Sequence, residues 1–112
     1  MSEEQKIDVP TVAMGVIINA GDGRLAIDRA MDALSALDFE TAEAQLAEAD
    51  AKILAAHKAQ TEMIQREAGG EKVDFSILLV HAQDTLMTIA AELHMAKKMM
   101  PVVRALAAAA GK

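Results

Sequence analysis

Several residue types that mark whole classes of protein are scarce in this chain of 112 residues. It has no cysteine, which excludes disulfides and thiolate metal sites and suits a reducing compartment. It has no tryptophan or tyrosine, and its only aromatic residues are Phe39 and Phe75. The 11 Lys and Arg residues are outnumbered by 17 Asp and Glu, which gives a net charge of −6. Because nucleic-acid phosphates require a basic surface, this charge argues against nucleic acid and permits a partner protein with a basic face.

Long apolar runs are also missing. The runs ILLV and MM are interrupted or followed by polar residues, among them His81, Asp84, Glu92 and Lys97. A membrane-spanning helix needs about 20 consecutive apolar residues. The start, MSEEQKID, is polar and lacks the apolar segment of a secretory signal. We therefore expect a cytoplasmic protein without direct membrane insertion.

The residues that are abundant favour helices. Apolar residues make up 53% of the chain, and most of them are Ala, Leu, Met and Ile, which are good helix formers or core-filling side chains. The length fits one domain with a modest core. The composition predicts an all-α protein.

The apolar spacing predicts three helices, at about residues 10–37, 39–68 and 75–100. Residues 1–9 are expected to form a flexible polar N-terminus, and residues 101–112 a C-terminal tail or short helical turn.

Caps and breakers define the expected helix ends. Asp38 and Asp74 are the predicted N-caps of the second and third helices. Pro101 is expected to end the third helix, because it has no N–H to donate. Gly21 and Gly23 each cost about 1 kcal/mol in a helix interior, so they indicate a kink, a break or a close packing point. Of these, we expect a locally loosened first helix.

The third helix carries two apolar stripes on nearly opposite faces when residues are placed at about 100° per position. The inner stripe contains Phe75, Leu78, Leu79, Ala82, Leu86, Ile89, Ala90 and Leu93. The outer stripe contains Ile77, Val80, Met87, Ala91 and Met95. A three-helix bundle can bury only one of these faces. The outer stripe therefore predicts an oligomer built around this helix, and the alternative is that residues 102–112 fold back over it.

Two polar residues lie at the outer stripe. Asp84 is near its centre, where a carboxylate is costly unless it is paired or bound to a cation. In a symmetric oligomer each copy brings its own Asp84 close to the axis, and such a cluster favours an oxygen-preferring cation such as magnesium. His81 lies at the border of the stripe. A lone histidine on a helix is more often structural than catalytic, but imidazole is well suited to accept and release a phosphoryl group.

Residues 76–88 read SILLVHAQDTLMT. This segment resembles the signature of the lactose/cellobiose-type enzyme IIA of the bacterial sugar phosphotransferase system, whose usual form is close to LVHAQDHLMT. The segments MGVIINAGDGR at 14–24 and AHKAQTEMIQREAGGEKVD at 56–74 also resemble this family, so the similarity covers roughly residues 10–100.

The resemblance implies an antiparallel three-helix bundle that assembles as a homotrimer. It implies a phosphocarrier that accepts a phosphoryl group from phospho-HPr on His81. The carrier then passes that group to the cognate enzyme IIB, for uptake of a disaccharide such as lactose, cellobiose or chitobiose. Asp84 matches the family's ligand to Mg²⁺, shared among three subunits on the trimer axis. Gln83 matches the motif glutamine, a supporting catalytic residue that points away from His81 on the wheel and would have to act from a neighbouring chain.

This chain departs from the family pattern in two places. Thr85 replaces the second motif histidine, and the C-terminal segment MMPVVRALAAAAGK does not match the family's usual polar helix end. These departures support one alternative function, a non-catalytic or regulatory helical oligomer that keeps the IIA fold. Of the other histidines, His57 is expected to make a polar contact between helices, and His94 to lie on the surface.

Overall fold

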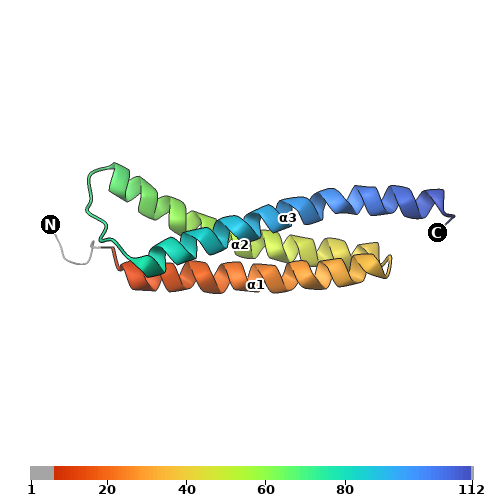
Figure 1. The fold of residues 1–112 in the computed structure, drawn as a ribbon, viewed down its shortest axis with the longest axis horizontal. Helices are drawn as coiled ribbons and strands as arrows, with labels where there is room; N and C mark the ends of the chain where they lie inside the picture. Colours follow the sequence, from red (N-terminus) through yellow and green to blue (C-terminus); the bar gives the residue numbers. More distant parts are fainter. Residues whose placement is uncertain (1–6, 112) are drawn as a thin grey trace.

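The computed structural model describes residues 7–111 and consists of three long helices. They are α1 (Val9–Ser35), α2 (Phe39–Ala68) and α3 (Ile77–Ala109). Helices α1 and α2 form an antiparallel hairpin, and α3 packs along it in the direction of α1 (Figure 1). The α3 helix makes most of its contacts with α1, because the C-terminal half of α2 diverges from α3 (Figure 1). The predicted all-α three-helix bundle is confirmed.

The first helix begins and ends within two residues of its predicted limits. Asp8 is its N-cap and accepts a hydrogen bond from the backbone N–H of Thr11 at 3.2 Å. The helix starts at Val9, which is buried, so this residue does not belong to a flexible tail. Residues 1–6 of the predicted flexible N-terminus lie outside the described residues. The helix ends at Ser35 rather than at residue 37, because Leu37 adopts a positive φ of 60° in the turn to α2.

The second helix has the predicted limits. The Asp38 carboxylate accepts a hydrogen bond from the N–H of Thr41 at 3.1 Å and caps the first turn. At the other end Gly70 has a φ of 106°, and the following N–H of Glu71 bonds the carbonyl of Arg66 at 3.1 Å. Glycine adopts this left-handed conformation without strain, and Gly70 thereby ends the helix.

The predicted limits of the third helix, 75–100, are wrong at both ends. Its N-cap is Ser76, whose hydroxyl accepts from the N–H of Leu79 at 3.2 Å, and not Asp74. At the other end the helix runs through Pro101 to Ala109, so residues 101–109 are helix rather than a tail. A proline inside a helix costs about 3 kcal/mol or more. Tertiary contacts beyond it oppose that cost, because Arg104 pairs with Glu43 and stacks 4.7 Å from the Phe39 ring centre.

The core lies along the line where the three helices meet. Its largest fully buried side chains are Val16, Leu86 and Ile89. The inner stripe of α3 packs into this core as predicted, with the exception of Phe75, which is 84% exposed. Phe75 precedes the N-cap and lies outside the helix, so helical periodicity does not describe where its ring points.

Gly21 and Gly23 do not loosen α1, which is continuous through both positions. Gly23 is buried against α2, and a Cβ added there would come within 2.8 Å of Ile53 Cγ1 and 3.6 Å of the Ala49 carbonyl oxygen. A Cβ added at Gly21 would meet nothing within 4 Å. Gly23 therefore permits the close approach of the two helices, whereas Gly21 has no such contact.

This difference predicts opposite effects of the same substitution. Gly21→Ala should raise the free energy of unfolding by about 0.5–1 kcal/mol through helix propensity. Gly23→Ala should lower it by about 1–2 kcal/mol, because Ile53 must move. Urea denaturation followed by circular dichroism measures both. Equal stabilisation by both alanines would contradict the proposed close packing at Gly23.

Candidate functional site

The outer stripe of α3 is not covered by any other part of the described chain. Ile77 is 77% exposed, Met87 56% and Met95 60%. The stripe continues along α3 through exposed Met99, Val102 and Leu106. Because α3 continues as one helix to Ala109, residues 102–109 do not fold back over the stripe. The stripe is therefore exposed in the single chain, and the oligomer that the sequence predicts stays a prediction.

His81 lies in the second turn of α3, at the edge of the outer stripe on the flank that faces α1. Its side chain is exposed and makes no hydrogen bond with residues 7–111. Thr85 and Thr88 follow on the same flank, one and two turns further along the helix. Thr85, which replaces the family's second histidine, is half-buried.

Asp84 is exposed near the centre of the outer stripe, about 60° around the helix from His81. It forms no hydrogen bond or ion pair within the described part of the chain. No group of three His, Cys, Asp or Glu side chains among residues 7–111 is arranged to hold a metal ion. A single chain therefore brings one carboxylate to this position.

Gln83 lies on the opposite flank of α3 from His81. It lines a hollow of about 180 Å³ between the end of α2 and the start of α3, together with Met63 and Leu79. Within one chain the structure does not bring Gln83 and His81 together, which agrees with the angle of about 160° between them on the helical wheel.

The other two histidines are exposed. His57 contacts Thr61 of the same helix, with 3.3 Å between Nδ1 and Oγ1. The predicted contact of His57 between helices is therefore wrong. His94 lies on the surface, as predicted.

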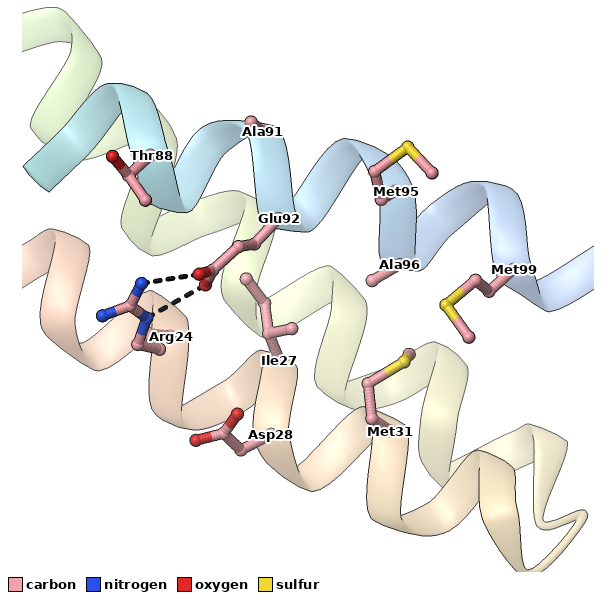
Figure 2. Close-up of a pocket in the computed structure, with 10 residues that line it drawn as sticks. All are labelled: Arg24, Ile27, Asp28, Met31, Thr88, Ala91, Glu92, Met95, Ala96 and Met99. Atoms are coloured by element: carbon pink, nitrogen blue, oxygen red, sulfur yellow. Dashed lines mark hydrogen bonds and ion pairs between the residues drawn. The ribbon is translucent and has the colours of Figure 1, made fainter. Parts of the chain in front are cut away.

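A groove runs between α1 and α3 from Thr88 toward the C-terminal half of α3 (Figure 2). Its volume is about 740 Å³. We call it the Met groove, because Met31, Met95 and Met99 lie along it (Figure 2). Its other lining residues are Arg24, Ile27, Asp28, Thr88, Ala91, Glu92 and Ala96.

An ion pair joins the two walls of the Met groove. Arg24 donates from Nε and Nη2 to the two carboxylate oxygens of Glu92, at 2.9 and 2.6 Å (Figure 2). These hydrogen bonds, with the positive charge of Arg24, hold the pKa of the Glu92 carboxyl below its ordinary value. The pair is formed at neutral pH and its contribution is lost as the pH falls through that lowered pKa. Sequence reasoning missed this pair because its members are 68 residues apart.

Comparison with known proteins places these features in a family. The family model for the lactose/cellobiose-specific IIA subunit of the phosphotransferase system matches residues 11–104. The lactose-specific EIIA component of Lacticaseibacillus casei is 40% identical over 83 residues, which is 74% of each chain. The lichenan-specific enzyme IIA component of Bacillus subtilis is 40% identical over 87 residues, covering 78% of this chain and 76% of the relative.

Solved structures agree with the sequence matches. The crystal structure of PtcA from S. mutans superposes with a TM-score of 0.85 at 34% identity, covering 93% of this chain and 99% of that one. The cellobiose-specific enzyme IIA from Bacillus anthracis also gives 0.85, at 31% identity, with 96% and 98% covered.

The chain belongs to the lactose/cellobiose-specific IIA family of the sugar phosphotransferase system. It is thus a IIA component of a phosphotransferase system of the lactose/cellobiose type. None of its helices, within residues 7–111, has an apolar stretch that is long enough to cross a membrane.

Proposed function

We propose that this protein is a cytoplasmic phosphocarrier that accepts a phosphoryl group from phospho-HPr on His81 and transfers it to the cognate enzyme IIB. The system it serves takes up a disaccharide such as lactose, cellobiose or chitobiose. The observation that carries this proposal is the position of His81. It stands in the HAQD motif of a IIA family member, on a rigid helix, with an exposed ring that has no hydrogen-bond partner in the described chain.

The transfer step exchanges one phosphorus–nitrogen bond for another. The lone pair on Nε2 of neutral His81 attacks the phosphorus of the donor's phosphohistidine. The bond between that phosphorus and the donor's ring nitrogen breaks, and its electron pair returns to the donor's imidazole. Each imidazole keeps its other N–H, so no net proton transfer is required. Because the transition state is loose, the rate depends mainly on alignment and on hydrogen bonds to the phosphoryl oxygens.

Positioning is the contribution that this chain can make. The α3 backbone fixes the position of His81 along the helix axis. Ala82 and Leu86 are both fully buried, so they fix how the helix is rotated about its axis against the core. Gln83 is on the far flank of its own helix, so it would hydrogen-bond near a neighbouring subunit's His81. This arrangement requires an oligomer, and the uncovered outer stripe supports a homotrimer.

The residues present fit a magnesium ion shared on the trimer axis. The Asp84 carboxylate is exposed within the apolar outer stripe and has no partner among the described residues. Three such carboxylates around an axis would repel one another, and a divalent cation that prefers oxygen ligands would neutralise them. When bound, the ion would supply positive charge that holds the three chains together.

Phosphorylation in vitro tests the proposed function directly. Incubation with phosphoenolpyruvate, enzyme I and HPr should add one phosphoryl group per chain. Since imidazole nitrogen is the nucleophile, the label should be lost in acid and retained in base. A base-labile and acid-stable label would indicate an ester or acyl phosphate and would contradict the assignment to histidine. Absence of any label would favour the non-catalytic alternative.

A further inference from the structure

The chain contains one short pattern twice, a histidine that is followed four residues later by a threonine. The two segments are HKAQT at 57–61 on α2 and HAQDT at 81–85 on α3. In both pairs the histidine is exposed and the threonine is half-buried. Side chains four residues apart on a helix are neighbours, so each threonine lies beside its histidine.

The first pair shows what this spacing allows. Oγ1 of Thr61 lies 3.3 Å from Nδ1 of His57, which is within hydrogen-bond distance. The contact uses Nδ1, and it leaves the other ring nitrogen, Nε2, without a hydrogen bond in the described part of the chain. On a helix of this protein, a threonine hydroxyl therefore reaches the Nδ1 atom of a histidine four residues before it.

In the second pair both side chains are without partners in the single chain. Neither the His81 ring nor the Thr85 hydroxyl forms a hydrogen bond among residues 7–111. Thr85 lies about 40° around the helix from His81, on the side of the buried inner stripe. Half-burial and a branched Cβ restrict the rotamers of Thr85, so little entropy is lost when its hydroxyl meets the ring.

The other neighbours of His81 on α3 are less suitable. Those one turn away are Ile77, Leu78, Asp84 and Thr85. Only Asp84 and Thr85 have a side-chain oxygen. Asp84 is exposed and lies about 60° around the helix in the other direction, toward the centre of the outer stripe, where the proposed trimer places it at the axis. Thr85 is thus the acceptor beside the ring when Asp84 binds the cation.

A hydrogen bond at Nδ1 determines which nitrogen is the nucleophile. In a neutral imidazole one nitrogen carries the proton and the other carries the lone pair, and a hydrogen bond to one of them selects the tautomer. When the Thr85 oxygen accepts from Nδ1–H, the lone pair is on Nε2. The Nε2–phosphorus bond then forms as the donor's nitrogen–phosphorus bond breaks, and Nδ1 keeps its proton throughout.

We propose that Thr85 is a positioning residue for phosphoryl transfer, whose hydroxyl oxygen accepts a hydrogen bond from Nδ1–H of His81. This contact orients the ring and keeps the lone pair on Nε2. The inference rests on the proposed function, because it assigns a role in that same reaction. Threonine then supplies a hydrogen-bond acceptor at the position where the family motif has its second histidine.

Nitrogen NMR of the imidazole rings tests the contact without any phosphoryl transfer. The chain has only three histidines, so His57→Ala and His94→Ala assign the signals. At about pH 9, where histidine is neutral, His81 should be mainly the Nδ1–H tautomer. Thr85→Val keeps the shape of the side chain without its hydroxyl and should lower the Nδ1–H fraction by about twofold or more. Thr85→Ser should restore it.

The same variants are then compared in their rate of labelling by phospho-HPr. Loss of one hydrogen bond should slow the labelling of Thr85→Val roughly threefold to tenfold, and Thr85→Ser should recover the wild-type rate. Thr88→Val, two turns from His81 on the same flank, and Thr61→Val on α2 are matched controls and should label at the wild-type rate. Thr61→Val should change the NMR signals of His57 only.

Circular dichroism should show wild-type helix content for every variant. A wild-type tautomer in Thr85→Val would overturn the proposal, and so would a changed tautomer with an unchanged labelling rate. Loss of the Nδ1–H preference in Asp84→Leu but not in Thr85→Val would assign the contact to Asp84 instead. Absence of label on the wild type would refute the proposed function, whereas the tautomer measurement decides independently whether Thr85 bonds His81.

Discussion

Replacing His81 by alanine should abolish phosphorylation of this protein completely. The proposed chemistry has one nucleophile, and alanine has no atom that can accept the phosphoryl group. His57→Ala and His94→Ala should label to the wild-type extent, because both residues are exposed and lie outside the HAQD motif. All four proteins should be compared in the reaction with phosphoenolpyruvate, enzyme I and HPr. Protein folding is checked by thermal melting, and little change is expected because the His81 side chain is exposed.

Labelling of His81→Ala at the wild-type level would refute the proposed mechanism. If His57→Ala lost the label instead, the acceptor would be on α2, where His57 contacts Thr61. Either result leaves the membership in the IIA family intact, since that rests on the match over residues 11–104.

Replacing Asp84 by leucine should make the assembly insensitive to chelators. In the wild type, a chelator should lower the melting temperature by roughly 10 °C or more. This follows because two charges 4 Å apart repel by about 4 kcal/mol at an effective dielectric of 20, and 1 kcal/mol shifts the melting temperature of a domain this small by about 4–8 °C. Asp84→Leu removes the charges and adds apolar surface to the interface, so it should remain trimeric.

Light scattering and thermal melting at a fixed protein concentration measure this response, since the stability of an oligomer depends on concentration. The expected mass is about three times the chain mass of 11.9 kDa. Asp22→Leu, at an exposed position on α1, is the matched control and should keep the response to chelator. If Asp84→Leu responded to chelator as strongly as the wild type, Asp84 would not be the metal ligand. A wild type that scatters as a monomer would refute the trimer as well.

The parts of this fold that sequence alone predicts are those set by local interactions. The limits of α2 follow from Asp38, which caps the first turn through Thr41, and from the glycines that end it. The inner stripe could also be predicted, because the spacing of apolar residues along a helix shows which face is buried. The motif around His81 and Asp84 likewise lies within one helix, so their relative placement could be predicted from the sequence.

The predictions that failed depend on contacts between helices. Pro101 is a local signal to end α3, yet the helix continues beyond it, and its last turns contact α2, where Arg104 meets Glu43 and Phe39. From the sequence, Gly23 is expected to weaken α1. In the structure, Ile53 of α2 occupies the space that a side chain at this position would need.

The sequence by itself determined that the chain has three helices, which family it resembles and which residue is the candidate phosphoacceptor, because each follows from spacing and motifs within single segments of the chain. Only the tertiary structure decided that the outer stripe is left uncovered and that a groove opens beside it. The walls of the groove come from α1 and α3, and Arg24 and Glu92 are brought together across 68 residues by the packing of the whole bundle. Such a contact has no local signature, because its energy comes from burial and charge pairing between segments that meet only in the folded chain.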